Sequence, residues 1–149
     1  MCRDEISKYS FQKNIFSLQK SLERIVEDIA NEINKDVLII CDRGTCDGIA
    51  FLSDADWARL IATYDTTFEK ELNAYNAVFF MPSVSVDYPE LYINTNIRNY
   101  PLLNAQIENE KLYKIWKSHK NFHVINNHPT FEMKLEELLV KVKKVLDKE

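Results

Sequence analysis

Two charged residues, Asp42 and Arg43, stand together directly after the uncharged run Val37–Cys41. A carboxylate in such a place can hold Mg²⁺ through water or accept a substrate proton. A neighbouring arginine can pair with phosphate or carboxylate groups. Asp47 adds a second carboxylate nearby. Alternatively, the aspartate caps the following helix and the arginine bonds to it, and the residues by themselves favour neither interpretation.

Arg98 is a second candidate for phosphate chemistry. It lies within residues 83–100, whose prolines, serines, asparagines and tyrosines predict a long loop. An arginine on such a lid can close over transferring phosphates. The alternative is a solvated surface arginine.

Zinc binding is a weaker alternative. The pairs Cys41–Cys46 and His119–His123 have spacings within the range of zinc ligands. However, Cys41 belongs to a predicted buried strand, while His119 ends a predicted helix. These positions argue against a single zinc site.

The chain has only two glycines, Gly44 and Gly48, which permit a tight turn with positive φ. A phosphate-binding P-loop requires a glycine followed by lysine and then serine or threonine. No Gly-Lys dipeptide occurs in this sequence. The usual backbone cradle for nucleotide phosphates is therefore absent.

Length and composition indicate one globular domain spanning residues 1–149. The net charge of −4 argues against nucleic-acid binding. No apolar run approaches the roughly 20 residues that cross a membrane, and the N-terminus lacks the apolar core of a signal peptide. Three cysteines without disulfide-framework spacing predict reduced thiols and a cytoplasmic location.

Helices and short apolar runs alternate along the chain. Residues 6–35 carry a helical stripe at steps of four and three, which fits a helix packed on a sheet or a short coiled coil. The stripe comprises Phe11, Ile15, Leu18, Leu22, Ile25 and Ile29. Strands are predicted at 37–41, 77–81 and 122–126, and helices near 54–64, 67–73, 101–119 and after Thr130. Strands separated by helices predict an α/β fold with a parallel sheet.

Several short motifs, in this order and spacing, resemble the NadR-like P-loop ATPases, a nucleoside-kinase-like family with AAA-type and TRPL-translocation-defect-type members. The resemblance covers most of the chain. Its motifs are Phe11-Gln12 with Gln19 and Glu23, Ile39–Gly44 with Asp47-Gly48, Tyr75–Val78, Tyr92 with Asn96, Arg98 and Ala105, Trp116 with His119, and Ile125–Asn127 with Phe131 and Lys134.

The resemblance implies a three-layer parallel sheet of the P-loop kinase type, incomplete at the N-terminus because the P-loop region would precede the first helix. It implies Mg²⁺ with ATP or GTP and a small nucleoside-like acceptor. Asp42 would either hold Mg²⁺ through water or act on the phosphoryl acceptor. Arg43 and Arg98 would act in catalysis. Asp47 and Asn126 would contact the nucleotide.

Two functions follow as expectations. The first is the C-terminal two-thirds of a P-loop NTPase or kinase domain, inactive without its missing N-terminal part. The alternative is a binding module without catalysis, with a protein or phosphoinositide partner. The sequence does not decide whether this chain is an enzyme.

Overall fold

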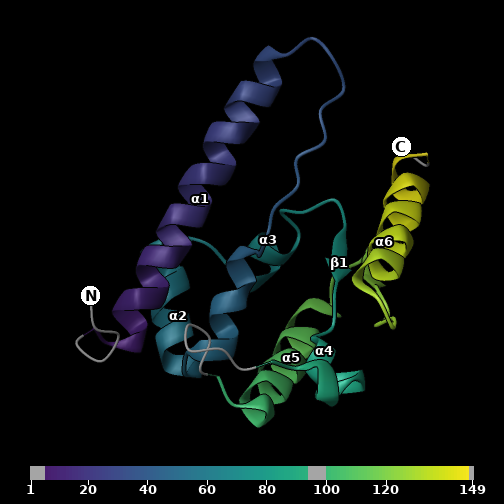
Figure 1. Cartoon of the computed structure of the whole chain (residues 1–149). Helices are drawn as coiled ribbons and strands as arrows, with labels where there is room; N and C mark the ends of the chain where they lie inside the picture. Colours follow the sequence, from purple (N-terminus) through teal and green to yellow (C-terminus); the bar gives the residue numbers. More distant parts are fainter. Residues whose placement is uncertain (1–5, 94–99, 148–149) are drawn as a thin grey trace. The chain divides into compact units, whose positions relative to one another are not determined.

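The computed structural model describes residues 6–93 and 100–147, which divide into two compact units, Met1–Leu72 and Asn73–Glu149. Figure 1 shows both, coloured along the sequence.

The first unit is helical. It contains α1 (Lys8–Glu32), the 3₁₀ helix η2 (Thr45–Phe51), α2 (Asp54–Thr63) and α3 (Phe68–Leu72). Serine side chains begin the two longer helices. Ser7 Oγ accepts a hydrogen bond from the N–H of Ser10 at 3.1 Å, and Ser53 Oγ accepts one from Asp56 at 3.2 Å. Each hydroxyl satisfies an N–H that has no partner within its helix. The helices predicted at 6–35, 54–64 and 67–73 are confirmed.

Aromatic side chains join α1 to α2. The buried Phe16 ring lies 6.2 Å from Trp57 and 4.9 Å from Tyr64, measured between ring centroids. Leu60, which has no exposed surface, and Cys46 complete this small core together with Ala50 and Leu72. One face of α1 is therefore anchored by Phe16.

The second unit contains a parallel strand pair with helices around it. Strand β1 (Val78–Phe80) pairs with β2 (Phe122–Val124), with Val78 opposite Phe122. The helices are α4 (Val84–Asp87), the 3₁₀ helix η3 (Pro89–Leu91), α5 (Leu102–Trp116) and α6 (Phe131–Leu146). Thr130 begins α6, because its side chain accepts a hydrogen bond from Met133. The parallel pairing, both strands and both long helices are confirmed, whereas part of the predicted loop 83–100 is helical.

The predicted three-layer parallel sheet of the P-loop kinase type is wrong. In the part of the chain that the structure describes, the sheet has two strands, β1 and β2. Residues Val37–Cys41 follow α1 as an extended segment without secondary structure. No backbone hydrogen bond joins them to a neighbouring strand among the described residues. The predicted strand at 37–41 is therefore wrong as well, because a strand is stable only when a second strand satisfies its N–H and C=O groups.

Within the ranges 6–93 and 100–147, no helix combines the length and apolar character needed to cross a lipid bilayer.

Candidate functional site

The predicted catalytic pair lies in an exposed turn between the extended segment and η2. The Arg43 guanidinium contacts the Asp47 carboxylate, with Nη1 and Oδ2 3.2 Å apart. Arg43 is 61% exposed and Asp47 only 15%. Asp42 is exposed beside them. The structure therefore places Asp42 and Arg43 in the turn, joins Arg43 to Asp47 in η2, and leaves Asp42 exposed to solvent.

The turn differs from the sequence-based expectation in two ways. Asp42 does not cap the next helix, because η2 begins after Gly44 and has no side-chain cap. The left-handed residue is Arg43, at φ 77°, and neither described glycine has positive φ. A non-glycine residue in this region costs on the order of 1–3 kcal/mol. Such strain is found often at binding sites, so the Arg43 backbone is a functional signal that the sequence did not reveal.

Cys46 and Glu71 lie in the interior behind the turn. Glu71 is 2% exposed; its Oε1 accepts a hydrogen bond from Thr66 Oγ1 at 2.6 Å, and its Oε2 lies 3.3 Å from Lys20 Nζ. Burial, then the charges of Glu71 and Asp47, raise the pKa of the Cys46 thiol to about 12. A thiol with such a pKa is protonated at neutral pH, so Cys46 is a packing residue and a poor nucleophile or zinc ligand.

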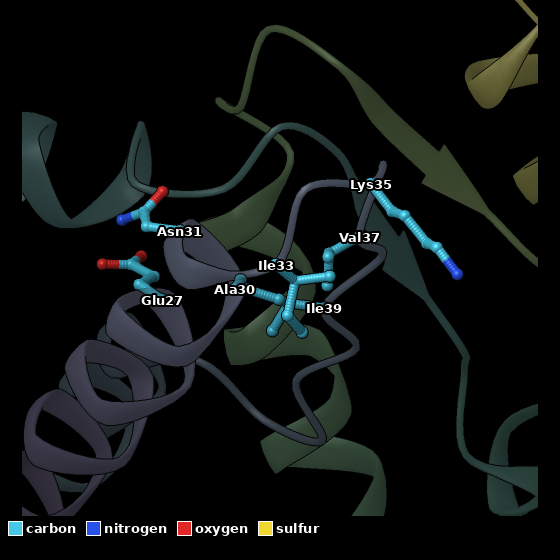
Figure 2. Close-up of a pocket in the computed structure, with 7 residues that line it drawn as sticks. All are labelled: Glu27, Ala30, Asn31, Ile33, Lys35, Val37 and Ile39. Carbon is cyan, nitrogen blue, oxygen red and sulfur yellow. The ribbon is translucent and has the colours of Figure 1, made fainter.

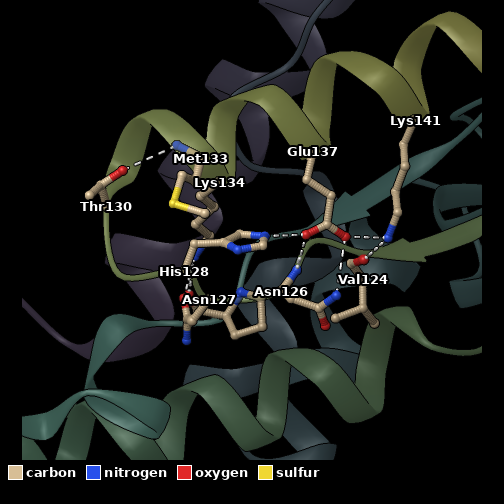
Figure 3. Close-up of polar contacts among 10 residues, drawn as sticks. Val124, Asn126, Asn127, His128, Thr130, Met133, Lys134, Glu137 and Lys141 are labelled. Atoms are coloured by element: carbon tan, nitrogen blue, oxygen red, sulfur yellow. Dashed lines mark hydrogen bonds and ion pairs between the residues drawn. The ribbon is translucent and has the colours of Figure 1, made fainter.

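Asn126, the predicted nucleotide contact in the second unit, is held by α6 (Figure 3). Its backbone N–H donates to Glu137 Oε2 at 3.1 Å, and its side-chain amide donates to Glu137 Oε1 at 3.2 Å. His128 Nε2 and Lys141 Nζ approach the same carboxylate at 2.7 and 2.6 Å. Hydrogen bonds from Lys141 and His128 lower the pKa of Glu137 to about 2.

A second set of polar contacts joins the ends of both strands to α6. Lys134 Nζ donates to the Pro82 carbonyl and to Asn127 Oδ1, both at 2.6 Å. Asn127 in turn donates to Asp87 Oδ2 at 2.6 Å. Burial lowers the pKa of Lys134. These groups satisfy one another, so this edge of the two-stranded sheet is fastened by side chains. Asn126 itself is exposed, and Glu137 accepts its backbone N–H and one hydrogen bond from its side-chain amide.

Glu137, whose carboxylate organises this network, was not among the site residues predicted from the sequence. The available signal was the spacing of Glu137 and Lys141, which places them on one face of a helix. The approach of His128 was not predictable, because it depends on how the loop before α6 folds back.

The two histidines of the zinc interpretation have structural partners instead. His119 is buried; its Nδ1 accepts from the N–H of Asn121 at 3.1 Å, so its Nε2 carries the proton donated to the Tyr75 carbonyl at 2.8 Å. His123 Nε2 contacts Asn121 Oδ1 at 2.8 Å. Among the described residues, no three His, Cys, Asp or Glu side chains gather as a metal site would require.

The extended segment exposes four consecutive aliphatic side chains, Val37 to Ile40, of which Ile40 is 81% exposed. A cavity of about 520 Å³ lies between this segment and the end of α1. Figure 2 shows Ala30, Ile33 and Val37 with Ile39 at its centre, and Lys35 directed to one side. Partial burial, together with the carboxylates of Glu23 and Glu27, raises the pKa of Cys41. The segment therefore runs beside acidic residues of α1.

Arg98 lies outside the described residues. No family model, no curated protein and no solved structure matches this chain. The NadR-like resemblance, and the nucleotide chemistry that it implies, stay predictions.

Proposed function

We propose that this chain is a protein-binding module that pairs the segment Val37–Ile40 with an extended segment of a partner. The observation that supports this is the combination of open backbone and exposed aliphatic side chains in that segment. Exposed apolar surface and unpaired strand-like backbone are both hallmarks of strand addition between proteins.

The charges around the segment favour a partner with basic residues beside its apolar strand. Residues 23–36 contain five carboxylates and two cations. Two of those carboxylates, Glu23 and Glu27, act directly on Cys41. Backbone hydrogen bonds would supply affinity, alternate aliphatic side chains would supply specificity, and the acidic flank would select for lysine or arginine.

The test is an array of peptides of about ten residues, alternating Val, Ile and Thr, with either Lys/Arg or Asp/Glu at both ends. We expect the chain to bind peptides with basic ends and to reject those with acidic ends. Ile40→Asp should abolish binding because it puts a charge within the pairing surface. Leu139→Asp, an equally drastic change at an exposed position of α6, is the control and should bind normally.

Hydrogen exchange in the complex supplies a second measurement. Amides of residues 37–41 should exchange more slowly when the peptide is bound, since pairing protects them. Binding that leaves their exchange unchanged, or that survives Ile40→Asp, would contradict the proposal.

A second candidate function is Mg²⁺-nucleotide binding at the turn of Asp42, Arg43 and Asp47, and the strained Arg43 backbone favours it. The Arg43–Asp47 ion pair opposes it in part, because a phosphate would compete with the Asp47 carboxylate for Nη1 of the guanidinium. We expect no affinity for Mg²⁺-ATP or Mg²⁺-GTP tighter than about 100 μM, since the sequence lacks the Gly-Lys-Ser/Thr motif of a P-loop. Titration calorimetry decides this, and Asp42→Ala is the matched variant if heat of binding appears.

A further inference from the structure

The helix α1 carries an apolar seam with the period of a coiled coil. Six residues recur at alternating steps of four and three, and each is exposed by more than a third of its surface. In heptad notation, Ile15, Leu22 and Ile29 occupy a positions, while Phe11, Leu18 and Ile25 occupy d positions. The seam lies well away from the buried Phe16, which occupies a b position and anchors α1 to its own unit. A strict repeat of this kind is typical of packing against another helix.

The distribution of charge along α1 favours a second copy of α1, in the opposite direction, as that other helix. Residues 8–22 contain three lysines and no acid, whereas residues 23–32 contain four carboxylates and one arginine. Each half therefore has a net charge of three, positive in the first half and negative in the second. Two copies of α1 side by side in the same direction would place like charges together. Two copies in opposite directions place each positive half beside a negative half.

The residue positions fit an antiparallel pair as well. With a two-fold axis that crosses the seam at the level of residue 20, each a residue meets a d residue of the second copy. Leu22 then meets Leu18, Ile15 meets Ile25, and Ile29 meets Phe11. The next positions outward are Lys8 at a and Glu32 at d, so an opposite-charge pair closes the seam at both ends. The self-complementary contact set is what a two-fold symmetric interface requires.

The flanking residues also tolerate this arrangement. Across the axis, Gln19 meets Gln19 of the second copy, and Asn14 meets Asp28. No two like charges face each other. The helix has 25 residues, so the seam is about 37 Å long.

We propose that this chain forms an antiparallel homodimer through the α1 seam. The dimer is independent of the strand-pairing function, because the residues that act on Cys41, Glu23 and Glu27, occupy b and f positions away from the seam. Failure of one therefore leaves the other testable.

The experiment is sedimentation equilibrium of the full chain under reducing conditions, over concentrations of about 5 to 200 μM. We expect wild-type protein to reach twice the mass of the chain. Leu22→Asp should weaken the dimer by at least about 100-fold, because it places two charges at the centre of the seam. Asn31→Asp adds the same charge to α1 outside the seam and should change the dissociation constant of the dimer by less than about threefold. A monomeric wild type, or a dimer that Leu22→Asp leaves intact, would overturn the proposal.

A charge exchange tests the direction of the pair. Lys8→Glu and Glu32→Lys should each weaken the dimer by about tenfold, since each creates a like-charge pair, and the double variant should recover wild-type mass. In a parallel dimer Lys8 would meet Lys8, and Glu32 would meet Glu32. Single reversals without effect, or no recovery in the double variant, would therefore overturn the antiparallel arrangement. Circular dichroism of each variant confirms that α1 is retained.

Discussion

Two runs of five uncharged, mostly apolar residues differ in whether they form a paired strand. They are Val37–Cys41 in the first unit and Ala77–Met81 in the second. The second run forms β1, paired with β2, and its residues are mostly half-buried. The first run stays extended, and Ile40 is largely exposed. Apolar character favours a strand at both places, but a strand exists only where another chain segment offers its backbone.

The surroundings of the two runs explain the difference. The run that pairs is followed by polar contacts that fasten its end. Lys134 donates to the Pro82 carbonyl, and the Ser83 N–H donates to Asn109 Oδ1. Lys141 also reaches the Val124 carbonyl on β2 at 2.5 Å. The run that does not pair is followed by the strained Arg43 and by one ion pair that is partly open to solvent. The second unit is thus closed around its strands, and the first presents its run outward.

The largest effect in this comparison is expected from replacing one aliphatic residue in each unit, Ile125, which is bonded to the second run, and Ile40, which lies within the first. Ile125, which follows β2, has 0% exposure, and its N–H donates to the Phe80 carbonyl at 2.8 Å. Ile125→Ala should lower the free energy of unfolding of the second unit by about 2–5 kcal/mol, through lost burial and the cavity left behind. Ile40→Ala should change the free energy of unfolding of the first unit by less than about 0.5 kcal/mol.

The two tryptophans allow each unit to be followed separately in urea. Trp57 belongs to the first unit and Trp116 to the second, so Trp57→Phe and Trp116→Phe backgrounds isolate one signal each. If Ile125→Ala and Ile40→Ala lowered the free energy of unfolding equally, the first run would be buried in solution. The contrast between the two runs would then disappear.

Glu137 provides a smaller effect, one that depends on pH. Its folded pKa is about 2, below the ordinary value of 4.5. The contribution of ionised Glu137 to the stability of the folded unit is therefore present above about pH 4.5, the pKa of the unfolded carboxyl. This contribution is lost as the pH falls towards 2. Glu137→Gln should cost about 1.5–3 kcal/mol at neutral pH by weakening the contacts to His128, Lys141 and Asn126.

Urea unfolding of the second unit between pH 2 and 7 measures this. The wild type should lose stability between pH 4.5 and 2, and Glu137→Gln should lose less in that window. Glu110→Gln is the matched control, because Glu110 forms an exposed pair with Lys114 at 3.2 Å and should matter little. The same pH profile in wild type and Glu137→Gln would show that the network does not fasten the strand ends.

Local features of the fold were predictable from sequence, and pairing between distant segments was not. The helices that begin after Ser53 and Thr130 were predictable, because a helix start depends on neighbouring residues such as these two capping side chains. The fate of Val37–Cys41 was not, since it depends on whether another strand lies beside it. For the site, the closeness of Asp42, Arg43 and Asp47 followed from their spacing. The left-handed Arg43 did not, because two glycines nearby were the better candidates for positive φ.

The smallest effect is expected at Arg43, where substitution separates backbone strain from the ion pair. Arg43→Gly removes both the left-handed penalty at φ 77° and the contact with Asp47, whereas Arg43→Ala removes only the contact. Because the Arg43 side of the ion pair is open to solvent, the pair should contribute under about 1 kcal/mol, so Arg43→Ala should be slightly destabilising. Arg43→Gly should be about 1 kcal/mol more stable than Arg43→Ala, measured by urea unfolding with Trp57 as the signal. Equal stabilities would mean that the turn relaxes in solution, and the strain would then no longer mark this turn as a binding site.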